Sequence, residues 1–149
     1  MPKSRNVFLF LLAAAVFMTG CRSRQEWSQV FASRGRDYVK QGRLESAADE
    51  FEKAMRIDRK NAEVYLDAAD LFYKMNQPKR VIETLNIAFS LRSDASVRYW
   101  ALYAECLAAV GQLKMSERYF KKAAEADPSN PEYLKRVQEV SRLIKKEAV

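Results

Sequence analysis

Asp67 and Asp70 are the two residues whose types and spacing come closest to a catalytic or metal-binding pair. Three positions apart on a helix, they would share one face, where two carboxylates could hold a metal ion or exchange a proton. The same spacing is typical of a solvated helix surface. The chain contains no histidine, so the commonest general base and transition-metal ligand is missing. We interpret the pair as structural and predict that the protein is not an enzyme.

Neither the cysteines nor the glycines form a cofactor site. Cys21 and Cys106 lie far apart in the sequence and do not form the paired motif of a zinc site. The four glycines, at positions 20, 35, 42 and 111, are too scattered for a phosphate-binding loop. We therefore predict no metal and no cofactor. Cys106 lies within a long apolar helical pattern, which favours a buried, unreactive thiol.

Cys21 directly follows a segment with the layout of a secretory signal peptide. Lys3 and Arg5 precede an uninterrupted apolar run, Val7 to Met18, and two small residues follow it. As a helix this run rises only about 18 Å, whereas the hydrocarbon core of a bilayer is about 30 Å thick. We predict that residues 1–20 are a signal peptide and not part of the mature fold.

The last residues of this segment, Met-Thr-Gly-Cys, resemble the lipobox of bacterial lipoproteins. The resemblance implies cleavage after Gly20 and attachment of acyl chains such as palmitate to Cys21, which would anchor the protein without a transmembrane helix. Lipoproteins kept in the inner membrane generally carry aspartate where this chain has Arg22, so the resemblance implies the outer membrane, facing the periplasm. Residues 21–27 would form a lipidated tether. An ordinary signal peptide with a chance cysteine is the alternative.

The chain is basic, with 26 Lys and Arg against 19 Asp and Glu, and a formal net charge of +7. Removal of Lys3 and Arg5 with the signal peptide lowers this charge to +5. The basic residues are spread along the chain and interleaved with acids, so we predict no nucleic-acid partner. Anionic lipid headgroups, close to Arg22 and Arg24, or an acidic protein surface are better partners.

Four sets of landmark residues repeat with spacings of 34 and then 35 positions. They are an aromatic residue (Phe31, Tyr65, Trp100), a turn residue (Gly42, Asn76, Gly111), a large apolar residue (Phe51, Leu85, Phe120) and an alanine (Ala54, Ala88, Ala123). In the first unit, apolar residues at helical spacing predict helices over 28–41 and 44–57. Glycine and asparagine best tolerate the left-handed backbone just past a helix, so each unit is predicted to be a helix–turn–helix.

These units resemble tetratricopeptide (TPR) repeats, in which an aromatic, a Leu-Gly pair, a tyrosine, two alanines, a phenylalanine and a proline recur over 34 residues. The first unit matches at Phe31, Gly35, Tyr38, Ala47, Phe51 and Ala54, and the third at Trp100, Ala104, Leu107, Phe120, Ala123 and Pro128. The second unit departs most. The resemblance implies an all-α solenoid of three repeats, 28–61, 62–96 and 97–130.

A further helix over 131–147 is predicted to cap the array. Asn130, Pro131 and Glu132 form a good helix start. A single apolar stripe follows, made of Leu134, Val137, Val140, Leu143 and Ile144. At the other end, Trp27 could seal the first repeat, one turn before Phe31.

The TPR resemblance also implies a concave groove lined by fixed positions of each first helix. By register these are Gln29, Ala32, Arg36, Val39 and Lys40, then Glu63, Leu66, Asp70, Tyr73 and Lys74, then Arg98, Ala101, Glu105, Ala108 and Ala109. We predict that Leu66 and Tyr73 are apolar anchors for a ligand. Some TPR co-chaperones clamp a C-terminal carboxylate, but the clamp positions here hold Ala32, Arg36, Asp67, Arg98 and Leu102. That ligand class is therefore not expected, and plain solvent exposure is the alternative for each groove residue.

Together these features predict a lipid-anchored periplasmic adaptor that binds an envelope protein or peptide segment in its groove. The resemblance points to assembly of envelope complexes, and in its sharpest form to a pilotin-like role in secretin or type IV pilus biogenesis. The alternative is an accessory factor that positions a peptidoglycan hydrolase or synthase.

Overall fold

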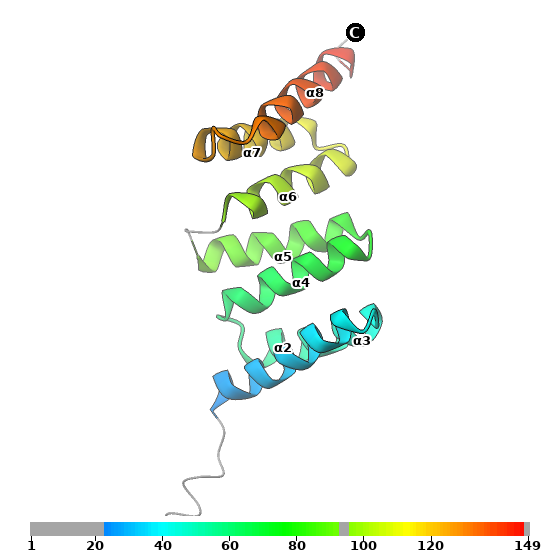
Figure 1. Cartoon of the computed structure of the whole chain (residues 1–149), viewed down its shortest axis with the longest axis vertical. Helices are drawn as coiled ribbons and strands as arrows, with labels where there is room; N and C mark the ends of the chain where they lie inside the picture. Colours follow the sequence, from blue (N-terminus) through cyan, green and yellow to red (C-terminus); the bar gives the residue numbers. More distant parts are fainter. Residues whose placement is uncertain (1–22, 93–95, 148–149) are drawn as a thin grey trace, which may run out of the picture.

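The computed structural model describes residues 23–92 and 96–147, which form seven helices and no strand. The predicted signal peptide and Cys21 lie outside the described residues. The helices pack as three successive hairpins, with the last helix on the third, and Figure 1 shows them stacked along the long axis of the molecule. They are α2 (Arg24–Lys40), α3 (Leu44–Ile57), α4 (Ala62–Lys74), α5 (Pro78–Leu91), α6 (Val97–Ala109), α7 (Leu113–Ala126) and α8 (Pro131–Glu147). The predicted all-α array of three repeats and a capping helix is confirmed.

The hairpin turns depend on one left-handed residue each. Gly42, Asn76 and Gly111 have φ values of 74°, 54° and 81°. Just after each of them, a backbone N–H reaches back five residues to a helix carbonyl, as from Gln77 to Phe72 and from Gln112 to Leu107. These bonds satisfy carbonyl groups that the helix end would otherwise leave unpaired. The turn residues predicted from the repeat are thus confirmed as helix C-caps.

Large aromatic rings packed against small residues make up the core. Phe51, Phe72 and Phe120 are each 1% exposed. The repeated alanines Ala47, Ala54, Ala88 and Ala123 are buried as well. Gly35 lets α2 lie directly on α3, because a Cβ atom at this position would lie 2.9 Å from the Phe51 ring. Small residues at these positions therefore set how closely the helices of a hairpin approach.

The first helix begins at Arg24, four residues before the predicted start at Ser28. Ser23 and Glu26 form a capping box, in which the Glu26 N–H donates to Ser23 Oγ (3.2 Å) and the Ser23 N–H donates to Glu26 Oε2 (2.7 Å). Residues 24–27, which we assigned to the tether, are therefore the first turn of α2. Only two residues, Arg22 and Ser23, remain in the sequence between the predicted acylation site at Cys21 and the start of the helix.

The capping helix is buried only along the middle of its predicted stripe. Asn130 Oδ1 accepts the Glu132 N–H at 3.1 Å and caps α8 as expected. Val140 is buried, but Leu134 and Leu143 are 54% and 48% exposed. No described helix follows α8, so the two flanks of the stripe have nothing to pack against. At the other end, Trp27 contacts Phe31 yet stays 44% exposed, so it covers that end only in part.

Candidate peptide-binding groove

The predicted groove positions lie on α2, α4 and α6, the first helices of the three hairpins. Polar side chains on these helices pair from each helix to the next. Arg36 Nη1 on α2 lies 2.5 Å from Asp67 Oδ2 on α4. On α6, Arg98 forms an ion pair with Asp70 of α4, and the Tyr99 hydroxyl donates to Asp70 Oδ2 at 3.2 Å. The concave face is thus tied together by interhelical bonds.

The pairing continues to the capping helix. The Tyr73 hydroxyl on α4 donates to Glu105 Oε2 on α6 at 2.9 Å. Glu105 Oε1 in turn lies 3.9 Å from Arg136 Nη2 on α8. These contacts join four helices in one row, which we call the concave ladder: Arg36, Asp67, Asp70, Arg98, Tyr73, Glu105 and Arg136.

Two ladder arginines, Arg36 and Arg98, are more exposed than the aspartates with which they pair. The Arg36 side chain is 45% exposed and that of Asp67 30%, while the values for Arg98 and Asp70 are 62% and 29%. Each aspartate has its own arginine on a different helix, which supports a structural role for the Asp67–Asp70 pair. The surface offered to a ligand at these two positions is therefore guanidinium, with the carboxylates fixing its orientation.

Hydrogen bonding and burial shift the pKa values of three ladder residues. The hydrogen bond to Glu105 raises the pKa of Tyr73, and the hydrogen bond to Asp70 raises the pKa of Arg98. Both donors therefore keep their protons at neutral pH. Burial raises the pKa of Asp67, and the hydrogen bond from Arg36 offsets part of that effect. The Arg36 guanidinium thus favours the charged form of the Asp67 carboxyl, against the effect of burial.

Several predicted groove residues lie elsewhere. Leu66 is only 6% exposed and belongs to the core, so its prediction as an apolar anchor is wrong; Ala32, at the same register position of α2, is buried as well. Glu63 pairs with Arg92, the residue that follows α5, and Lys40 pairs with Asp37 of its own helix. Gln29 and Lys74 are exposed outside the ladder. Of the predicted groove residues, the structure therefore brings Arg36, Asp70, Tyr73, Arg98 and Glu105 together in the ladder.

Arg136 and Tyr99 are ladder contacts that sequence reasoning missed. The sequence pattern predicts α8 only as a helix that covers the apolar end of the array. In the structure, α8 follows the third hairpin in the position that the first helix of a fourth repeat would take. Extending the repeat register past residue 130 would have indicated this role. Tyr73, Glu105 and Arg136 border a cavity of about 230 Å³ between α4, α6 and α8.

Cys106 also lines this cavity, but its thiol is inert. It is 2% exposed, and burial raises its pKa to about 11 from an ordinary 9.0. A rise of that size lowers the thiolate fraction at pH 8 by about 100-fold. In a Cys21→Ser variant, where Cys106 is the sole thiol, we expect an aromatic disulfide reagent to react at least about 100-fold more slowly with folded than with denatured protein. Fast reaction of the folded protein would show that the cavity wall opens readily.

Other kinds of site find no support in the described part of the chain. No group of three or more Cys, Asp or Glu side chains there could hold a metal ion. No helix over residues 23–92 and 96–147 is long and apolar enough to cross a bilayer.

The sequence matches models of a known protein family. Two models, each described as tetratricopeptide repeat, match residues 38–106 and 97–130. Together they span residues 38–130, well over half of the 149 residues. The chain belongs to the tetratricopeptide repeat family. It matches no curated protein in sequence.

Solved TPR structures share this fold at low sequence identity. The first TPR domain of Spaghetti (RPAP3), bound to the HSP90 peptide SRMEEVD, is 19% identical with a TM-score of 0.71, over 81% of this chain and 95% of that one. The first TPR domain of human RPAP3 is 21% identical with a TM-score of 0.68, over 83% and 98%. YrrB, a TPR protein with an unusual peptide-binding site, is 23% identical with a TM-score of 0.72, over 79% and 60%. These likenesses show the fold alone.

Proposed function

We propose that this TPR protein is a lipid-anchored adaptor that binds an extended, acidic protein segment along its concave face. The observation that carries the proposal is the concave ladder, in which Arg36 and Arg98 lie outermost over Asp67 and Asp70. A ligand carboxylate would accept hydrogen bonds from the outer N–H groups of a guanidinium whose orientation an aspartate already fixes. The HSP90 peptide held by the Spaghetti TPR domain is acidic and gives a precedent for the ligand class.

The same geometry argues for internal carboxylates of the segment over its C-terminus. Of the five clamp positions, Arg36 and Arg98 are exposed cations, whereas Ala32 and Leu102 are buried and Asp67 is acidic. A terminal carboxylate would find no clamp to surround it. Two arginines on α2 and α6 instead suit side-chain carboxylates spaced along an extended strand.

The leader sequence supports the location that we propose. Acyl chains on Cys21 would hold the array at the periplasmic face of the outer membrane, and residues 18–21 and Arg22 support this placement. An anchored adaptor raises the local concentration of its ligand beside other membrane components. Assembly of an envelope complex, and most sharply a secretin or type IV pilus, is the process that we propose for it.

A photocrosslinking experiment tests the groove. Tyr73 is 49% exposed, so p-benzoylphenylalanine at this position would capture a bound segment in living cells while keeping an aromatic ring. We expect Arg36→Gln together with Arg98→Gln to lower capture about tenfold, because both guanidinium contacts are lost. The matched control is Lys79→Gln with Arg118→Gln, which removes two exposed cations outside the ladder. Circular dichroism checks that each variant stays helical.

The identity of the captured protein decides the pathway. Recovery of a secretin or pilus component would support the envelope-assembly proposal, and recovery of a peptidoglycan hydrolase or synthase would replace it with the accessory role. Capture of abundant proteins alone, unchanged by the double substitution, would contradict a specific groove ligand.

A further inference from the structure

The first-repeat end of the array carries a basic surface. It consists of Arg24 in the first turn of α2 and Arg56, Arg59 and Lys60 around the α3–α4 connection, and we call it the basic end. These residues line a cavity of about 820 Å³ together with Gln25, Ile57 and Asp58. All four basic side chains are exposed.

The charges of the basic end are not neutralised in the described part of the chain. Five other arginines each form an ion pair with a carboxylate: Arg36, Arg80, Arg92, Arg98 and Arg136. Among the described residues, no carboxylate lies within ion-pair distance of the basic side chains of Arg24, Arg56, Arg59 and Lys60. Asp58 is the acid that lines this cavity, and its Oδ1 already accepts the Lys60 N–H at 3.1 Å. The Glu26 carboxylate is likewise engaged with Ser23. The basic end is therefore available to an external anion.

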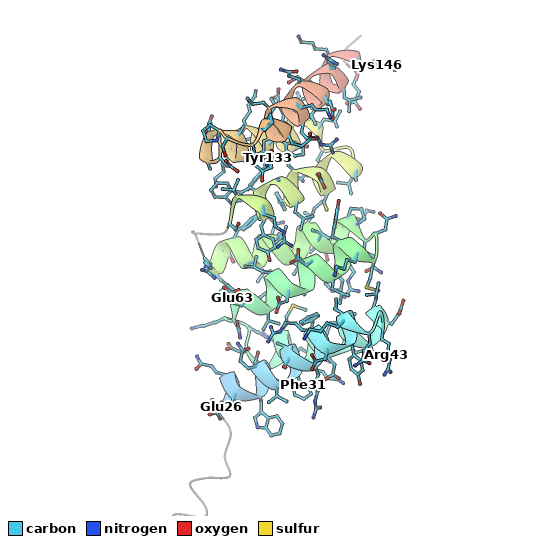
Figure 2. The ribbon with its side chains drawn as sticks, in the orientation of Figure 1. Glu26, Phe31, Arg43, Glu63, Tyr133 and Lys146 are labelled. Carbon is cyan, nitrogen blue, oxygen red and sulfur yellow. The ribbon has the colours of Figure 1, made fainter. Side chains whose placement is uncertain are left out.

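An aromatic side chain accompanies these charges. Trp27 is 44% exposed, and it lies three positions from Arg24 on α2, so both belong to the same face of the helix. Tryptophan is enriched at membrane–water interfaces, where its ring meets the headgroup region. Figure 2 shows Glu26, the neighbour of Trp27, at the end of the stack where the chain enters α2.

The length of the tether brings this end close to a membrane. Because α2 begins at Arg24, two peptide steps separate Cys21 from Ser23, and they span at most about 7 Å. That is about the depth of one headgroup layer. If Cys21 is acylated, the basic end cannot lie far from the lipid headgroups.

We propose that the basic end, with Trp27, binds anionic lipid headgroups, so that the array stands on the membrane with its first repeat down and α8 farthest away. The inference rests on the proposed lipid anchor for its location, but the surface itself is a property of the folded repeat. A bilayer containing phosphatidylglycerol has the matching charge, and attraction to it falls within a Debye length and weakens with salt.

Trp27 fluorescence reports the contact directly. The chain contains two tryptophans, so Trp100→Phe leaves Trp27 as the sole emitter. The full-length protein, processed in cells, is reconstituted into vesicles that contain brominated lipids, with or without phosphatidylglycerol. We expect Trp27 to be quenched and blue-shifted in the phosphatidylglycerol vesicles, and less so at high salt. Equal emission from the two kinds of vesicle would overturn the inference.

Charge reversal separates the surface from the anchor. In a Cys21→Ser protein exported with a signal peptide whose cleavage needs no cysteine, Arg56→Glu, Arg59→Glu and Lys60→Glu together should lower partitioning onto phosphatidylglycerol vesicles by on the order of 100-fold. Lys79→Glu, Lys114→Glu and Arg118→Glu, which reverse three exposed cations elsewhere, are the matched control and should lower it far less.

The two proposals can then fail separately. If the acylated protein stays in the vesicles but Trp27 is quenched equally with and without phosphatidylglycerol, the anchor is supported and the inference about the basic end is wrong. If the native protein carries no acyl chain on Cys21, the proposed anchor is wrong. If its Cys21→Ser form nevertheless binds phosphatidylglycerol vesicles through the basic end, the inference about the basic end still holds.

Discussion

Replacing Phe51 with alanine is expected to lower the free energy of unfolding by about 3–5 kcal/mol. The ring is 1% exposed and fills the space that Gly35 leaves between α2 and α3. Gly35, which faces the ring from α2, has no side chain that could fill the space left by Phe51, so the resulting cavity would stay largely open. Whole domains are stable by about 5–15 kcal/mol, so a three-repeat array would lose much of its folded population.

Denaturant unfolding followed by circular dichroism measures this loss. Leu134→Ala is the matched control, because it also removes a large apolar side chain, but from a position that is 54% exposed. It should change the free energy of unfolding by about 0.5 kcal/mol or less. Comparable losses for the two variants would mean that the capping helix is more deeply buried than described, or the first hairpin less so.

Replacing Cys21 with serine is expected to release the protein from the membrane. A serine hydroxyl offers no thiol for acylation, and the remaining basic end binds lipid only weakly and in a salt-sensitive way. More than one acyl chain is needed for stable anchoring, so their loss should move the protein almost entirely into the soluble fraction after a salt wash, provided that the variant is exported with a signal peptide whose cleavage needs no cysteine. Fractionation and metabolic labelling with palmitate measure the change.

Cys106→Ser provides the control for the second cysteine. That thiol is buried in α6, so its replacement should leave both the palmitate label and the membrane fraction unchanged. A Cys21→Ser protein that keeps its label, or that resists the salt wash, would contradict the lipobox interpretation of residues 18–21.

Local signals in the sequence were sufficient for most of the fold. The left-handed turns follow from glycine and asparagine at a fixed period, and α3 spans Leu44–Ile57, as the spacing of apolar residues predicts. The start of α2 was missed because the apolar pattern begins only near Val30. The Ser23–Glu26 capping box, which would have marked the start, is a polar signal that periodicity does not record.

The groove was less predictable, because its chemistry depends on pairs about 30 residues apart. Register places Arg36, Asp70 and Arg98 on one face, but it does not say that Arg36 selects Asp67 or that Arg98 lies over Asp70. Leu66 shows the same limit. Leu66 and Ala32 occupy the same register position of α4 and α2, and both are buried in the core.

The uncovered flanks of α8 leave apolar surface that a further helix could bury. Leu134 and Leu143 are exposed, and α8 already stacks on α7. A copy of α7 grafted after residue 147 could bury both leucines and lengthen the array without rebuilding its existing part. The C-terminus thus offers a natural site for engineering longer versions that recognise longer segments.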